Sequence, residues 1–178
     1  MATPDFWQWS QRIYARGDME RRLLDLQDSH GLNINLVLWC LWSGACFEAT
    51  DEVVVRKASD LSRTWSEAVT SPLRGVRRFL KSPPPQAALA DAALIRSSVK
   101  ELELSAEKVE QDMLQALALA YLKPSPDLPE AAIRARRALA AYVRTTDAAS
   151  SPGFSISLLE ALIELTFPSS ESDGDRVG

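Results

Sequence analysis

The sequence predicts an all-α protein, a helical bundle built around one central buried helix. Residues 34–42 read INLVLWCLW and contain a single polar side chain, Asn35. A helix that is apolar on every side has no face to turn to water, so neighbouring helices must cover it. The segments before and after it carry apolar residues at spacings of three and four, which is typical of amphipathic covering helices. No segment alternates with the period of two that predicts a strand.

Two amphipathic helices are expected before the central one. Thr3 and Pro4 are typical of a helix start, and an apolar stripe follows at Phe6, Trp9 and Ile13. The second helix is bounded by Asp18, a good N-cap, and by Gly31, a residue favoured just after a helix end. Asn33 can then cap the central helix.

A further helix is expected to begin at residues 50–52, where a cap and two acids meet the positive end of the helix dipole. Pro72 then breaks or kinks the helical run, because proline disfavours the helical conformation of the residue before it. A shorter helix over residues 72–81 follows, and we expect it to bury Leu73, Val76 and Leu80.

One long helix is expected from about residue 86 to residue 122, after three prolines at positions 83–85. Its apolar residues follow a heptad spacing at Ile95, Val99, Leu102, Ala106, Val109, Met113, Ala116 and Ala120. This heptad seam packs either within one bundle or in a coiled-coil dimer. Because three of the eight residues are alanines, the intrachain interpretation is favoured. The oligomeric state stays open.

Proline positions and composition divide the chain into three parts. Residues 1–123 are predicted to form a helical core domain. Residues 124–167, which begin with a second proline-rich linker, are expected to form a helical extension packed on or beside the core. Residues 168–178 are polar and charged, and this tail is predicted to be disordered.

Charge and cysteine content limit the compartment and the partners. The 178 residues carry a net charge of −4, which argues against nucleic acid as the main partner because phosphate binding needs a cationic surplus. Cys40 and Cys46 are not expected to form a disulfide, which fits a reducing cytoplasm. No apolar stretch reaches the ~18 residues of a membrane span, and the first residues do not resemble a signal peptide. We therefore expect a cytoplasmic protein.

The sequence contains no motif for catalysis or for cofactor binding. His30 is the only histidine, which excludes the usual multi-histidine zinc sites, and the two cysteines lack C-x-x-C spacing. There is no G-x-S-x-G elbow and no glycine-rich phosphate loop. No catalytic residue, metal ligand or cofactor is therefore predicted, and enzymatic activity is kept only as an alternative.

Three groups of residues are candidate sites. A polar turn cluster surrounds the start of the central helix at Gln27, Asp28, His30 and Asn35, and capping of helix ends is its favoured role. Five tryptophans lie in the first 65 residues, and a candidate pocket is lined by Trp9, Trp39, Trp42 and Trp65, although such residues more often form the core.

The third group is a basic face formed by Arg74, Arg77, Arg78 and Lys81. Their spacing of three and four puts them on one side of a helix, where they can bind an acidic surface or a phosphate. The residues by themselves favour another use, which is intrachain pairing or simple solvation of the charged face. The acidic residues available on the long helix are Glu101, Glu103, Glu107, Glu110 and Asp112.

Two motifs occur in order along the chain, L-Q-D-x-x-G-x-x-x-N-L over residues 26–36 and P-L-R-x-x-R-R-x-L-K over residues 72–81. Together they resemble a family of small, mostly proteobacterial proteins catalogued as a domain of unknown function, over about Phe6 to Leu122. Ile34 stands where that family often has valine. The resemblance implies no activity, but it implies signature positions at Gln27, Asp28, Gly31, Asn35, Trp65, Arg74, Arg77 and Arg78.

These observations favour a non-enzymatic cytoplasmic module that binds another protein through the basic face. An alternative is a helical protein that binds a small molecule or lipid, including an enzyme, in a pocket between the tryptophans and the polar turn cluster. A third interpretation is binding of RNA or the ribosome through the basic face and a second basic helix, which carries Arg134, Arg136, Arg137 and Arg144. The identity of the partner or ligand, and any reaction, cannot be read from the sequence.

Overall fold

The computed structural model describes residues 3–82, 89–125 and 130–168, and these residues form no strand. The prediction of an all-α fold is confirmed. The α-helices are α1 (Phe6–Tyr14), α2 (Met19–His30), α3 (Ile34–Cys46), α4 (Glu52–Trp65), α5 (Ser71–Phe79), α6 (Leu89–Tyr121), α7 (Ala131–Val143) and α8 (Ile156–Thr166). A π-helical turn, η1 (Ser66–Thr70), joins α4 to α5, and a 3₁₀ turn, η2 (Ala148–Ser150), precedes α8.

Helix α3 is buried along nearly its whole length, as its apolar sequence requires. Trp39, Leu41 and Trp42 are each 0% exposed. The side chain of Asn33 caps the helix, because its Oδ1 accepts hydrogen bonds from the backbone N–H groups of Asn35 and Leu36. Helices α1, α2, α4, α6 and α7 all contact α3.

Helix α7 approaches α3 most closely at Gly44. A Cβ atom at this position would lie 2.4 Å from the backbone nitrogen of Ala135, so only glycine fits here. Arg134 Nε donates a hydrogen bond to the carbonyl oxygen of Gly44 at 3.0 Å. The predicted division of the chain at residue 124 is not tested by these contacts and stays a prediction. They do place part of the C-terminal region directly on the central helix.

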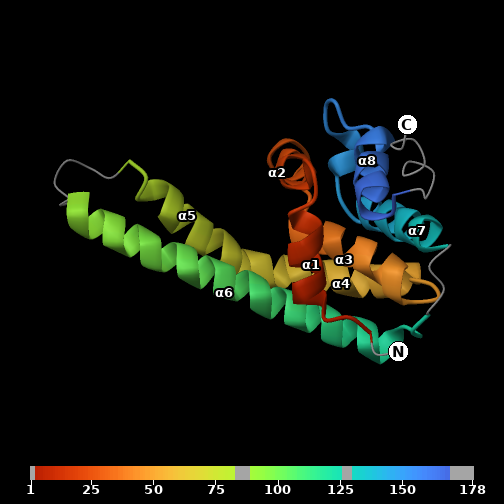
Figure 1. Cartoon of the computed structure of the whole chain (residues 1–178). Coiled ribbons are helices and arrows are strands. Elements are labelled where there is room, and N and C mark those ends of the chain that lie inside the picture. The colour runs from red at the N-terminus through yellow and green to blue at the C-terminus, as the bar shows by residue number, and fades with distance from the viewer. Residues whose placement is uncertain (1–2, 83–88, 126–129, 169–178) are drawn as a thin grey trace, which may run out of the picture.

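Pro72 does not end the helical run that starts at α4. The chain passes through the π-helical turn η1 and continues as α5, so that α4 and α5 together run along α6 (Figure 1). The start of α6 and the end of α5 project beyond the other helices (Figure 1). The burial predicted for α5 is wrong, because Leu73 and Leu80 are only half-buried and Val76 is 45% exposed.

The heptad seam of α6 is only partly used inside the chain. Val99 and Ala106 are buried, whereas Ile95, Leu102 and Val109 are 53%, 57% and 42% exposed. The side of α6 that faces the body carries polar residues as well as apolar ones, most of them outside the predicted seam. Its buried residues include Glu103, Glu110, Gln111, Leu114 and Ala118.

Two expectations lie mostly outside the described residues. They are the proline linker at 83–85 and the disordered tail at 168–178, of which only Pro168 is described. Across residues 3–82, 89–125 and 130–168, none of the helices combines the length and the apolarity needed to cross a bilayer.

Candidate functional site

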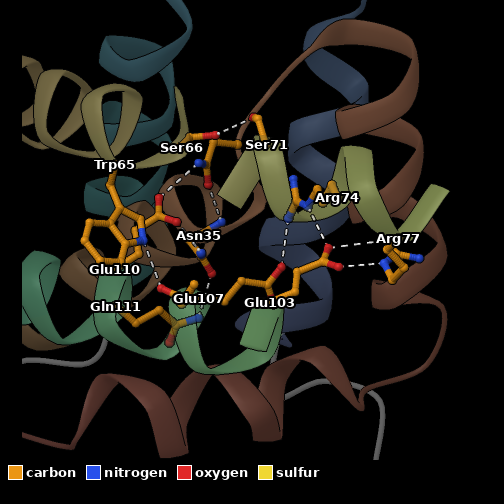
Figure 2. Close-up of polar contacts among 12 residues, drawn as sticks. Asn35, Trp65, Ser66, Ser71, Arg74, Arg77, Glu103, Glu107, Glu110 and Gln111 are labelled. Carbon is orange, nitrogen blue, oxygen red and sulfur yellow. Dashed lines mark hydrogen bonds and ion pairs between the residues drawn. The ribbon is translucent and has the colours of Figure 1, made fainter. Parts of the chain in front are cut away.

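The basic face of α5 lies along α6, and half of it is paired there. Arg74 donates to Glu103 Oε1 from Nε at 3.0 Å and to Glu107 Oε1 from Nη2 at 2.8 Å. Arg77 Nε donates to Glu103 Oε2 at 2.6 Å (Figure 2). Glu103 is largely buried, whereas the two arginines are partly exposed, so these charge-assisted bonds are partly shielded from water and hold α5 on α6.

The other two residues of the basic face, Arg78 and Lys81, are exposed. The structure therefore divides the predicted face. Arg74 and Arg77 serve intrachain pairing, the use that the residues by themselves favoured, whereas Arg78 and Lys81 present their charges to solvent.

A buried polar network links α3 to α6 next to these ion pairs (Figure 2). The Glu110 carboxylate accepts three hydrogen bonds, from Asn33 Nδ2 at 3.0 Å, from Asn35 Nδ2 at 2.9 Å and from the Ser62 hydroxyl. Gln111 Nε2 donates to Asn35 Oδ1 at 2.8 Å. The network thus satisfies polar groups that α3 and α6 bury against each other.

Burial shifts the pKa of titratable groups in the core towards their neutral forms. Burial raises the pKa of Glu110, although hydrogen bonds from Ser62, Asn35 and Asn33 oppose the rise. Burial also raises the pKa of Cys46 to about 12, so its sulfur stays a thiol at neutral pH and is a poor nucleophile.

A cleft of about 1020 Å³ is lined by residues of α1, α2, α3, α5 and α6. Its apolar lining comes from Trp7, Leu24, Ile34, Leu38 and Leu104. Leu24 and Leu104 are 40% and 54% exposed, so the cleft offers apolar contacts that the chain itself does not cover. We call this feature the main cleft.

Charges line the main cleft on two sides. The positive charges are those of Arg74, Arg77, Arg78 and Lys100, and the negative charges are those of Glu20, Asp28, Glu101, Glu103 and Glu107. Arg74 and Arg77 of α5 already pair with glutamates of α6, so Arg78 is the exposed arginine that an occupant meets on this wall. The other wall, formed by α2, carries the acids Glu20 and Asp28.

A second, smaller cleft of about 600 Å³ lies between α4 and the segment that follows α7. Asn33, Ser62 and Tyr142 belong to its lining. The Tyr142 hydroxyl accepts a hydrogen bond from the backbone N–H of Asn33 at 2.8 Å, so these groups already have partners within the chain.

The structure separates the members of the polar turn cluster. Gln27 and Asp28 line the main cleft, and Asn35 lies at its floor, 8% exposed. His30 Nδ1 instead lies 2.6 Å from Ser151 Oγ, and its ring contacts Phe154 edge-on at 5.4 Å between centroids. His30 thus joins α2 to the segment before α8 and is not part of the cleft.

The structure does not place the four tryptophans of the predicted pocket around a cleft. Trp39 and Trp42 are fully buried, and Trp9 belongs to the same core. Trp65 packs against α6, where its Nε1 donates to the Ala106 carbonyl oxygen at 3.0 Å. These four residues line neither of the two clefts, and the tryptophan of the main cleft is Trp7.

The sequence analysis did not single out Trp7, Leu104 and Gln111 as site residues. It named Glu103 and Glu110 only as members of an acidic group available for pairing with the basic face. One signal was available, because Glu103, Glu107 and Glu110 are spaced by four and three and so share one side of a helix. Only the positions of α3 and α5 show that this side faces inward.

Comparison with protein families finds a model described as "Protein of unknown function (DUF2390)", which matches residues 5–114. Searches of curated proteins and of solved structures found no match. The matched range covers more than half of the chain and contains every residue that lines the main cleft, from Trp7 to Gln111. It supports the predicted resemblance, and we conclude that the chain belongs to the DUF2390 family of proteins of unknown function.

Proposed function

We propose that this protein is a non-enzymatic interaction module that binds a segment of another protein in the main cleft. The observation that carries the proposal is the position of the cleft. It brings residues of both sequence motifs together, and all of its lining lies within the residues that define the family. The smaller cleft, by contrast, draws on Tyr142 and residues 144–147, which lie beyond the matched range.

The chemistry of the cleft suits a polypeptide better than a small molecule. Small-molecule pockets are mostly apolar and bury most of the ligand, with few polar groups. The main cleft has charged walls, and its apolar Leu24 and Leu104 are exposed at the surface. An amphipathic segment of a partner can cover these leucines while an acidic side chain meets Arg78.

RNA fits the main cleft less well than a protein does. Carboxylates of Glu20, Asp28 and Glu101 share the cleft with the arginines and would repel phosphates. The cytoplasm is the compartment that we propose, and two buried, unpaired thiols, Cys40 and Cys46, support it.

Charge reversal of Arg78 tests the proposal. Arg78→Glu is expected to leave the fold intact and to abolish capture of a partner from cytoplasmic extract, and wild-type capture should weaken as salt rises. Arg137→Glu is the matched control, because Arg137 is also exposed but belongs to α7, away from the cleft lining. Equal recovery of the same partner by wild type and Arg78→Glu at low salt would refute the basic face as a binding surface.

A further inference from the structure

The main cleft is built almost entirely from helix faces. Of the described residues that line it, all but Asn33 belong to helices, whose backbone N–H and C=O groups are mostly bonded within the helix itself. An extended segment buried there would bring unpaired backbone groups of its own and meet no strand edge that could pair with them. A helical segment satisfies its backbone internally, so it can be buried in the cleft without that cost.

A leucine lies at the centre of each of two cleft walls. On α2, Glu20, Leu24 and Asp28 line the cleft at a spacing of four, and Leu24 is 40% exposed. On α6, Leu104 is 54% exposed, and other lining residues precede and follow it by three and seven positions. Apolar residues on one face of an amphipathic helix can cover both leucines while its polar face stays in water.

The wall formed by α2 carries acids that the chain leaves unpaired. Glu20 and Asp28 are exposed, and neither forms an ion pair with another described residue. They lie four residues before and after Leu24, so they are about 12 Å apart along the helix at about 1.5 Å per residue. An occupant whose apolar anchor packs on Leu24 therefore meets a carboxylate one turn to either side of that anchor.

The wall formed by α5 and α6 has the opposite sign at Arg78. This arginine is exposed and has no ion-pair partner among the described residues, whereas Arg74 and Arg77 already pair with glutamates. Lys100 and Glu101 are adjacent on α6, so their charges largely offset each other. An occupant is therefore complementary to the cleft when it turns a cation towards α2 and an acid towards Arg78.

We propose that the occupant is an amphipathic helix of another protein, with a lysine or arginine one turn from the apolar anchor that packs on Leu24. An acidic residue on its opposite flank faces Arg78. This inference rests on the proposed function, because it specifies the kind of segment that the main cleft binds. It is supported by the helical walls, by the exposed leucine on each of them and by the unpaired acids of α2.

Crosslinking from position 24 tests the charge expected beside α2. A photoreactive phenylalanine analogue replaces Leu24 of the full chain in cells, and mass spectrometry identifies the partner residue joined to it. We expect a lysine or arginine three or four residues from the joined residue. A joined segment without such a cation, a segment from a second copy of this chain, or no adduct at all would overturn the inference. An adduct from position 104 that depends on Arg78 would still support the proposed function, so the two failures are distinguishable.

A synthetic peptide of the segment joined by position 24 or 104 tests the contact with α2. In fluorescence anisotropy with the full chain, Asp28→Lys should raise the Kd roughly tenfold, and glutamate in place of the peptide's basic residue should restore binding to this variant. Asp25→Lys is the matched control, because Asp25 is exposed on α2 but lies outside the cleft lining, and it should leave the Kd unchanged. With unchanged helical circular dichroism, equal effects of the two variants or no recovery on charge exchange would overturn the contact.

A proline in the same peptide tests its helical conformation. Proline in the middle of the segment, at a residue that neither crosslinker joins, should raise the Kd at least tenfold relative to alanine there, because proline breaks a helix. Equal binding of the proline and alanine peptides would overturn the helical occupant. That result would leave the cleft as a binding surface, and the proposed function would stand.

Discussion

Glu110 places a carboxylate in the core, and the residues that donate hydrogen bonds to it are all uncharged. It is 1% exposed, and Asn33, Asn35 and Ser62 supply its hydrogen bonds. Desolvation raises its folded-state pKa above the usual 4.5. Because the folded-state pKa is the higher one, the stability that protonated Glu110 contributes is complete below pH about 4.5 and is lost as the pH rises through the folded-state pKa.

Glu110→Gln removes this titration, and its effect should therefore depend on pH. We expect the variant to become more stable relative to wild type as the pH rises above about 4.5, because only the wild type then buries a charge. Its free energy of unfolding minus that of wild type should therefore increase with pH. Urea unfolding of both proteins over a pH series measures the difference. A difference that stays constant, or that shrinks as the pH rises, would contradict this assignment.

The positions of site residues on their helices could be predicted from the sequence, but the residues with which they pair could not. The spacing of Arg74, Arg77 and Arg78 correctly put them on one helix, and Asn33 correctly capped α3. Which arginines would be neutralised depends on Glu103 and Glu107, 26 to 33 residues away along the chain. Hydrophobic periodicity carries no information on such pairing.

At the scale of elements, α3 and α7 are in contact at a glycine. Gly44 is the point where a side chain would meet the backbone of Ala135. The sequence predicted both helices but not their contact, because the approach depends on a missing side chain. The same limit applies to α6. The heptad seam predicts that Leu102 and Val109 are buried, but Glu103 and Glu110 are buried in the structure while these two residues are exposed.

Gly44→Ala should destabilise the protein, because its Cβ atom would lie 2.4 Å from a backbone nitrogen that cannot move without shifting α7. Overpacking of this kind costs about 1–3 kcal/mol of the free energy of unfolding. Gly75→Ala is the control on α5, where no atom lies within 4 Å, and it should stabilise by about 0.5–1 kcal/mol through helix propensity. Thermal and urea unfolding measure both. A Gly44→Ala protein as stable as wild type would show that α7 does not pack so closely on α3.

At the scale of the whole molecule, one long helix separates two surfaces of different character. The main cleft, with its charged lining, lies on one side of α6, and the exposed side chains of Ile95, Leu102 and Val109 lie on the other. The sequence predicted the all-α class, and it named Gln27 and Asp28 in a polar turn cluster and Arg78 in a basic face. It did not predict the cleft, because the motifs that form its walls lie some 40 residues apart and meet only through the packing of α5 on α6.

Site-specific photo-crosslinking in cells tests most directly whether the main cleft holds a partner segment. A photoreactive phenylalanine analogue replaces Leu104, in the cleft lining and 54% exposed, or Leu119, 52% exposed on the same helix and outside the lining. The proposed function predicts a discrete adduct with another protein from position 104, none from position 119, and loss of the adduct when Arg78→Glu is added. No adduct from position 104, the same adduct from both positions, or an adduct unaffected by Arg78→Glu would contradict it.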